Sequence, residues 1–171
     1  MTRSAALAML LALGATSLGG CGLRPLYAGG GDGRVVGLLK GVEVAPIEGK
    51  AGWLVSNAVR DRLAAGGSGD QRYRLEIRLD DKITGLGVRG NDTVTRERRT
   101  LRARYQLVDL SNGEVVIDAT AGSDAGIDVV SSEYATIAAE DTALERLSGI
   151  VADQIVARLA LYAERTTPGA R

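Results

Sequence analysis

The sequence predicts an α+β domain: a four-stranded sheet in the element order β-α-β-β-β-α, with two helices packed on one face. Residues 72–83 and 94–110 alternate between apolar and polar side chains, which is the pattern of half-buried strands. Residues 51–65 and 131–164 repeat apolar side chains at helical spacing. Because only one face of the strands is apolar, we expect both helices to cover that face.

The first twenty residues have the three parts of a secretory signal peptide. A single basic side chain, Arg3, precedes an apolar run over residues 5–15, and small residues follow up to Cys21. A membrane-spanning helix needs about 20 apolar residues, which is more than this run provides. We therefore expect residues 1–20 to be cleaved as a signal peptide.

Cys21 is the only cysteine of the chain and follows Leu18, Gly19 and Gly20. This arrangement looks like a lipobox, in which the cysteine of a bacterial lipoprotein carries acyl chains; the alternative is a free structural thiol. One acyl chain binds a membrane only marginally, whereas two or three hold a protein there durably. We expect residues 21–34 to form a lipidated N-terminus and a flexible, glycine-rich linker.

The remaining elements follow in order within a domain expected to span residues 35–165. The first strand contains Val42 and Val44 and ends near Pro46. The helix over residues 51–65 stops at two glycines, and the strand over residues 72–83 follows.

The second half of the domain begins with an expected loop over residues 85–93 and a strand over residues 94–110. Ser111-Asn112-Gly113 is typical of a tight turn between antiparallel strands. The fourth strand covers residues 114–121, and a continuation to residue 130 stays open. Ser131 or Ser132 caps the final helix, and residues 166–171 form a disordered tail.

Composition excludes several classes of function. The chain has no histidine, which removes Ser-His-Asp and Cys-His catalysis and the commonest metal ligand. Its 21 basic and 21 acidic side chains balance, so there is no case for general nucleic-acid binding. Two carboxylates can cleave glycosides, but no pair stands out by its spacing. We expect no enzymatic activity, no cofactor and no metal.

Residues 85–90 match the spacing G-x-G-x-x-G of a dinucleotide-binding turn. In that motif a helix must follow, because its N-terminus binds the phosphates. Here the next predicted element is a strand, so these residues are interpreted as a hairpin loop.

Arginines gather on the polar side of the two alternating segments, where only Glu76 and Asp80 oppose them. This side is either a solvated face or an anion-binding surface, since arginine matches the geometry of phosphate and carboxylate. Arg89 lies in the loop that joins the two segments. The arginines on this side are Arg72, Arg74, Arg78, Arg96, Arg98, Arg102 and Arg104.

The chain beyond the signal resembles one family, the lipopolysaccharide-assembly lipoproteins, LptE. The resemblance begins with Cys21-Gly22-Leu23-Arg24-Pro25-Leu26-Tyr27. It continues through a helix containing Val59-Arg60-Asp61-Arg62-Leu63, a long-stranded meander and a long final helix with spaced alanines over residues 134–143.

This resemblance implies a lipoprotein at the periplasmic side of the outer membrane, anchored through acyl chains on Cys21. Members of the family plug the β-barrel LptD, help it to assemble and contribute to lipopolysaccharide transport. Lipopolysaccharide binding carries over to Arg89 and Arg96 and, by extension, to Arg98, Arg102 and Arg104. Two alternatives stay open: a structural envelope lipoprotein that binds peptidoglycan or another barrel complex, and a lipidated hydrolase that uses carboxylates.

Overall fold

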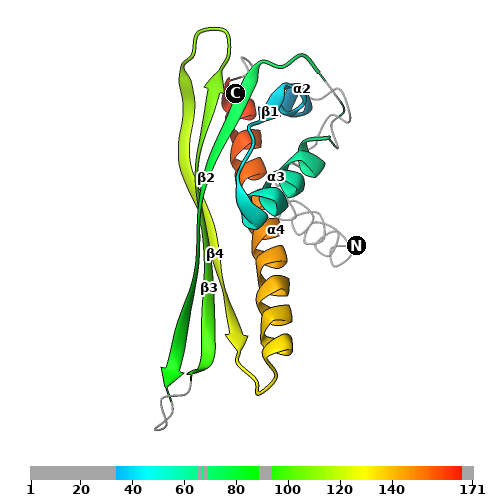
Figure 1. Ribbon diagram of the computed structural model, residues 1–171. Helices are drawn as coiled ribbons and strands as arrows, with labels where there is room; N and C mark the ends of the chain where they lie inside the picture. Colours follow the sequence, from blue (N-terminus) through cyan, green and yellow to red (C-terminus); the bar gives the residue numbers. More distant parts are fainter. Residues whose placement is uncertain (1–33, 65–66, 68, 89–93, 167–171) are drawn as a thin grey trace, which may run out of the picture.

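Four strands form one mixed sheet in the spatial order β1-β2-β3-β4 (Figure 1). The computed structural model describes residues 34–64, 67, 69–88 and 94–166. The predicted order β-α-β-β-β-α and the α+β class are confirmed, and the described residues add one short helix in front of the first strand. The described elements are α2 (Arg34–Lys40), β1 (Val42–Val44), α3 (Gly49–Ala64), β2 (Tyr73–Val88), β3 (Val94–Asp109), β4 (Val115–Asp128) and α4 (Glu133–Thr166).

The helix α2 was missed by the sequence analysis, which expected no helix before the first strand. Its apolar residues Val36 and Leu39 are three positions apart and both are buried, so one face of this short helix joins the interior. Packing against α4 thus decides the local structure, although the valines of this segment favour a strand.

The strand β2 is longer than predicted and runs to Val88 instead of ending before Gly85. Gly85 lies opposite Glu97, and Leu86 lies opposite Arg96, in an antiparallel ladder with β3. The glycines do not break the strand because β3 supplies backbone partners along this length. The expected loop is therefore wrong for residues 85–88, while residues 89–93 lie outside the described part of the chain.

The turn between β3 and β4 forms where Ser111-Asn112-Gly113 predicts it. Gly113 has φ = 74°, a left-handed conformation that favours glycine, and its N–H donates to the Asp109 carbonyl oxygen at 2.8 Å. The strand β4 continues past Ala121 to Asp128, paired with β3 throughout, so the longer of the two sequence alternatives is correct.

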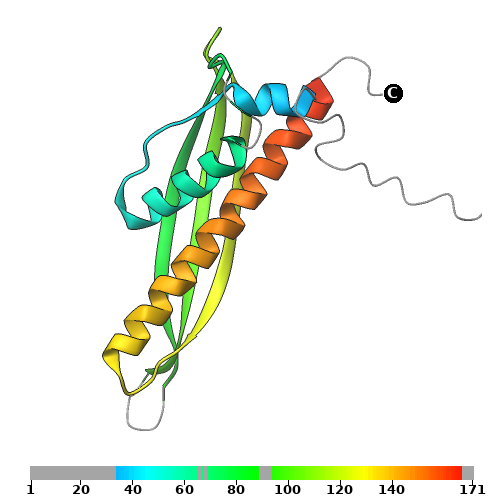
Figure 2. The same ribbon diagram turned by 90° about the vertical axis from the view of Figure 1, so that its right-hand side faces the viewer.

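Both long helices cover the same face of the sheet, as predicted (Figure 2). The helix α3 buries Val55, Val59 and Leu63. The helix α4 begins after Ser132, whose hydroxyl oxygen accepts the Ala135 N–H at 3.4 Å, so the predicted cap is confirmed. With 34 residues, α4 is about 51 Å long.

Ion pairs join the two helices along their length. Arg62 of α3 donates through Nε to Asp153 of α4 at 2.5 Å and through Nη2 to the Gly149 carbonyl oxygen at 3.1 Å. Lys50, near the start of α3, contacts Asp141 at 2.6 Å. These contacts hold α3 and α4 in register on the sheet.

Candidate binding surface: the polar face of the sheet

The face of the sheet turned away from the helices carries most of the arginines singled out in the sequence. The register places Arg74 and Arg78 of β2 on the same face as four arginines of β3, because directly opposite residues share a face. We call this the polar face. Its β3 arginines are Arg96, Arg98, Arg102 and Arg104.

The strand β4 adds a row of aspartates that the sequence analysis did not place on this face. Asp118 and Asp124 accept hydrogen bonds from arginine guanidinium groups on β3, each with a shortest N–O distance of 3.0 Å. Asp128 lies 3.2 Å from the Arg96 guanidinium. Three of the predicted anion-binding arginines therefore already have an acidic partner within the sheet.

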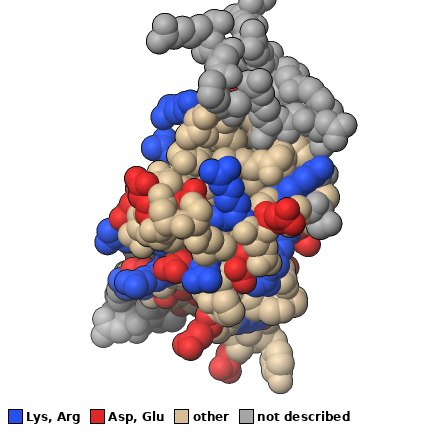
Figure 3. All heavy atoms as spheres, turned by 90° about the horizontal axis from the view of Figure 1, so that it is seen from above, with Lys and Arg blue, Asp and Glu red and all other residues tan. Residues whose placement is uncertain are grey.

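The charge of the polar face is consequently mixed instead of strongly positive. The sequence pattern predicts seven arginines against two acids on this face, whereas the strand residues of the whole face are seven basic and six acidic. Figure 3 shows a similar mixture of basic and acidic side chains on the end of the molecule seen from above. The basic members are Arg74, Arg78, Lys82, Arg96, Arg98, Arg102 and Arg104; the acidic members are Glu43, Glu76, Asp80, Asp118, Asp124 and Asp128.

The arginine partners stabilise the charged form of these aspartates. Hydrogen bonds from Arg104 and then from Gln106 lower the pKa of Asp118. Hydrogen bonds from the Thr100 hydroxyl and then from Arg102 lower the pKa of Asp124. Both carboxylates are ionised at neutral pH, and both accept hydrogen bonds from side chains of β3.

Two arginines of the polar face differ from the others, because Arg78 and Arg98 make no ion pair with any residue that the structure describes. Arg98 lies opposite Gly126, which has no side chain that could pair with the guanidinium group. Among the described arginines of the polar face, these two are the ones that an external anion could reach without displacing a carboxylate from an ion pair. Arg89 of the original set lies outside the described residues.

Arg72 lies apart from the polar face, in a cavity of about 720 Å³ between the start of β2, the β3–β4 turn and the end of α4. Its guanidinium carbon sits 5.4 Å from the centre of the Tyr73 ring, and its Nε lies 3.8 Å from Asp109. Hydrogen bonds from Ser111 lower the pKa of Asp109. Arg72 therefore supports the turn that precedes β4 and does not contribute to the polar face.

The helix-covered face also contains charge, which the sequence analysis missed. Arg99 donates to Asp81 of β2 through two nitrogens and to the Glu140 carbonyl oxygen of α4 at 2.9 Å. The sequence contains one indication of this placement. Arg99 comes two residues before Leu101, and residues two apart in a strand share a face, so Arg99 is expected on the apolar face. No group of acidic, histidine or cysteine side chains suited to a metal ion occurs among the described residues.

The described helices include none that combines the length and the apolar character needed to span a membrane. Cys21, the predicted lipidation site, falls outside the residues that the structure describes. The anchor therefore stays a prediction from the sequence.

Residues 39–159 match the model of a protein family described as LptE, lipopolysaccharide-assembly. A comparison with curated proteins finds no match. Among solved structures, a Caulobacter crescentus CB15 protein aligns with a TM-score of 0.64 and 26% identity, covering 77% of this chain and 98% of that chain.

Two further structures share the fold at lower identity. Rare lipoprotein B from Shewanella oneidensis aligns with a TM-score of 0.58 and 11% identity, covering 70% of this chain and 92% of that one. A minor lipoprotein from Acinetobacter baumannii aligns with a TM-score of 0.56 and 16% identity, covering 70% and 88%.

Proposed function

Because this chain belongs to the LptE, lipopolysaccharide-assembly family, we propose that it is an outer-membrane lipoprotein that pairs with the β-barrel LptD. The main support for this proposal is the family match over residues 39–159, which extends from α2 well into α4. In this role the protein plugs the barrel, aids its assembly and takes part in moving lipopolysaccharide outward, without catalysing a reaction.

The mixed charge of the polar face supports placement inside a barrel. The lumen of a large outer-membrane barrel is polar, so a protein that fills it must present polar groups of both signs. Seven basic and six acidic strand residues provide such a surface. Because most of them are paired within the sheet, the surface can meet the lumen without leaving many charges uncompensated.

The anchor in this proposal is Cys21, which follows the predicted signal peptide. Acyl chains on this residue hold the protein at the periplasmic side of the outer membrane. The expected linker over residues 21–34 then lets the domain reach its partner while the chains stay in the membrane.

Lipopolysaccharide is the second partner that we propose. Its phosphate groups match arginine forks, and the predicted contacts are Arg89, Arg96, Arg98, Arg102 and Arg104. Within this set, Arg98 is the strongest described candidate because it makes no ion pair inside the described sheet, whereas Arg102 must release Asp124 before it can bind an anion.

Affinity purification from outer membranes tests the barrel partnership. A tag at the C-terminus leaves Cys21 free, and a tagged lipoprotein of unrelated sequence serves as the control. We expect LptD to be recovered with this protein and not with the control. Recovery of peptidoglycan fragments without LptD would instead support the structural-lipoprotein alternative and overturn this proposal.

A further inference from the structure

The strand β4 forms one edge of the sheet, and half of its backbone groups point away from β3. In an antiparallel sheet, the N–H and C=O groups of one residue both face the strand on one side, and those of the next residue both face the other side. Val129 donates its N–H to Thr95 at 3.1 Å, so odd-numbered positions face β3. Beyond the register shift near the start of β4, the even-numbered residues from Asp118 to Asp128 therefore direct their backbone groups to the free edge.

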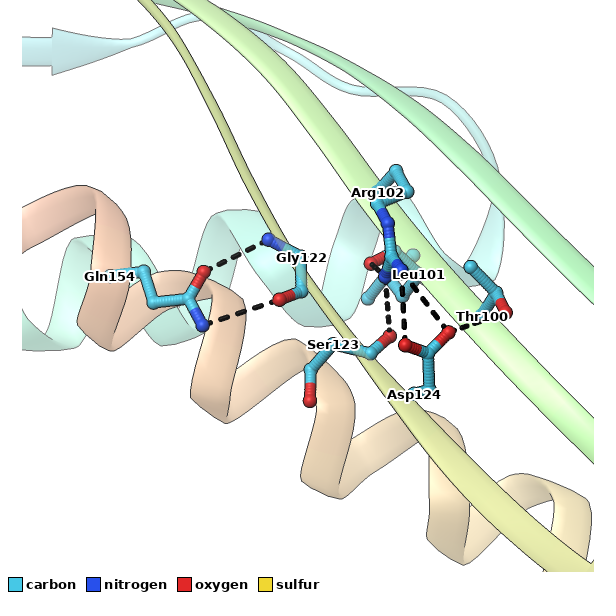
Figure 4. A network of polar contacts seen from close by, with 7 residues as sticks. All are labelled: Thr100, Leu101, Arg102, Gly122, Ser123, Asp124 and Gln154. Carbon is cyan, nitrogen blue, oxygen red and sulfur yellow. Dashed lines mark hydrogen bonds and ion pairs between the residues drawn. The ribbon is translucent and has the colours of Figure 1, made fainter.

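At one even position, the side chain of Gln154 on α4 occupies that edge (Figure 4). The Gly122 N–H donates to Gln154 Oε1 at 2.9 Å, and Gln154 Nε2 donates to the Gly122 carbonyl oxygen at 3.3 Å. A carboxamide presents an N–H donor and a C=O acceptor side by side, as a neighbouring strand does. Gln154 thus satisfies Gly122 as one residue of a neighbouring strand would.

Beyond Gln154, the edge stays open. The outward backbone groups of Asp124, Gly126 and Asp128 have no hydrogen-bond partner among the described residues. An edge of this kind can receive an extended segment of another protein as an added strand. We call the stretch Asp124–Asp128, together with the facing part of α4, residues 138–146, the β4–α4 seam.

The seam contains a hollow of about 450 Å³ on the side of α4. Its α4 wall consists of small side chains and one arginine, so side chains of an added strand would find room between the strand and the helix. Figure 2 shows that α4 runs obliquely over the sheet. The hollow is lined by Gly126, Ile127, Asp128, Ala138, Ala139, Thr142, Ala143 and Arg146.

The charged side chains of the β4–α4 seam indicate which kind of segment would bind there. Arg146 lines the hollow, and Arg98 lies opposite Gly126 on the polar face. Neither makes an ion pair within the part of the chain that the structure describes, although Arg98 interacts electrostatically with Asp124. Asp124 and Asp128, the acids on this edge, are already paired with Arg102 and Arg96. Side chains of an added strand alternate between the two faces, so neighbouring residues of that strand would meet Arg98 and Arg146 in turn.

We infer that the β4–α4 seam binds an extended, acidic segment of a partner protein by strand addition. The backbone groups of Asp124, Gly126 and Asp128 form the ladder with this segment. Acidic side chains at neighbouring positions of the segment pair with Arg98 on one face and Arg146 on the other. This inference does not depend on the lipopolysaccharide or barrel assignments, because it uses only the free edge and its charges.

The test uses the full-length protein in detergent and a capped peptide of about eight residues, rich in valine and threonine, with two neighbouring glutamates at its centre. We expect binding to slow hydrogen exchange at the amides of Asp124, Gly126 and Asp128. A peptide with lysines in place of the glutamates is expected to bind at least about tenfold more weakly.

Two substitutions at one position separate strand addition from other modes of binding. Gly126→Pro removes an N–H that points outward, so the ladder to β3 stays intact while the donor for an added strand is lost. Gly126→Ala keeps the donor, and no atom lies within 4 Å of the added Cβ. We expect Gly126→Pro to weaken peptide binding about tenfold or more and Gly126→Ala to leave it unchanged.

If Gly126→Pro fails to fold, the double variant Arg98→Gln/Arg146→Gln serves instead and should abolish the preference for the glutamate peptide. Equal affinity for both peptides in the unmodified protein would overturn the inference. So would full binding by folded Gly126→Pro, or unchanged exchange at the three amides.

Discussion

Arg99 of β3 and Asp81 of β2 form a two-pronged ion pair on the face of the sheet that α4 covers. Nε lies 2.9 Å from one carboxylate oxygen and Nη2 lies 2.6 Å from the other. Their side chains are 11% and 23% exposed. These hydrogen bonds raise the pKa of the Arg99 guanidinium above its ordinary value, against the opposing effect of burial. The third nitrogen, Nη1, bonds Glu140, so this pair joins β2, β3 and α4.

We expect Arg99→Leu to lower the free energy of unfolding by about 2–3 kcal/mol, because it leaves the Asp81 carboxylate partly buried without its cation. The double variant Arg99→Leu/Asp81→Leu should be less destabilised than the single variant, since no unpaired charge remains. Urea unfolding followed by circular dichroism measures both. A double variant less stable than Arg99→Leu would show that the pair is not the source of the cost.

Gly122 is expected to resist substitution, whereas Gly126 on the same strand tolerates it. A Cβ at Gly122 would lie 2.5 Å from Arg102 Cδ and 2.9 Å from the Leu101 carbonyl oxygen, which is backbone and cannot move aside easily. Gly122→Ala should therefore cost about 1–3 kcal/mol in unfolding free energy. Gly126→Ala should be neutral or slightly stabilising. Equal thermal stability of the two variants would contradict this prediction.

The sequence pattern alone predicts an element correctly where each side chain has only one favourable environment, either the core or the solvent. The alternation around Tyr73, Leu75 and Ile77 predicted the start of β2 and its buried face correctly, because the polar neighbours of these residues cannot enter the core without partners. The turn at Gly113 was equally clear, since its positive φ favours glycine.

The rest depended on partners distant in the sequence. The length of β2 beyond Gly85 follows from its pairing with β3, and α2 follows from packing against α4. The charge of the polar face was misjudged because Asp118, Asp124 and Asp128 lie on a strand rich in alanine and glycine, whose alternation is weak. The site of Arg99 could be recognised only once Asp81 and Glu140 were known to be its neighbours.

The Asp124 carboxyl is expected to titrate below an ordinary aspartate, whose pKa is about 3.9. The Thr100 hydroxyl contributes the largest part of the lowering and Arg102 the next. Thr100→Val should therefore raise the pKa of Asp124 toward the ordinary value, as measured by carbon NMR of the carboxyl group. A pKa for Asp124 that is the same in both proteins would contradict the assigned role of Thr100.

The same lowering links Asp124 to acid stability. Because its pKa is lower in the folded than in the unfolded protein, its contribution is complete above about pH 4 and is lost as the pH falls through the folded value. Asp124→Asn should make the decline in stability below about pH 4 shallower than in the unmodified protein. Chemical unfolding at a series of pH values measures this slope, and an unchanged slope would contradict the linkage.

Cys21→Ala is expected to release the protein from the membrane fraction into the soluble periplasm, because no acyl chain can then be attached. Growth with labelled palmitate provides the measurement: the unmodified protein should carry label and the variant should carry none. Label in the Cys21→Ala protein would show that the lipobox has been wrongly assigned.

Charge reversal at Arg89 and Arg96 is expected to weaken lipopolysaccharide binding, because repulsion replaces attraction to the phosphates. Arg98→Glu should weaken it further, since this arginine makes no ion pair among the described residues. Lys82→Glu, which reverses one charge on the same face outside the predicted set, is the control matched to Arg98→Glu. Binding to immobilised lipopolysaccharide, with circular dichroism to verify folding, measures the difference. If folded Arg98→Glu binds no more weakly than folded Lys82→Glu, the arginine acts through net charge alone and is not part of a binding site.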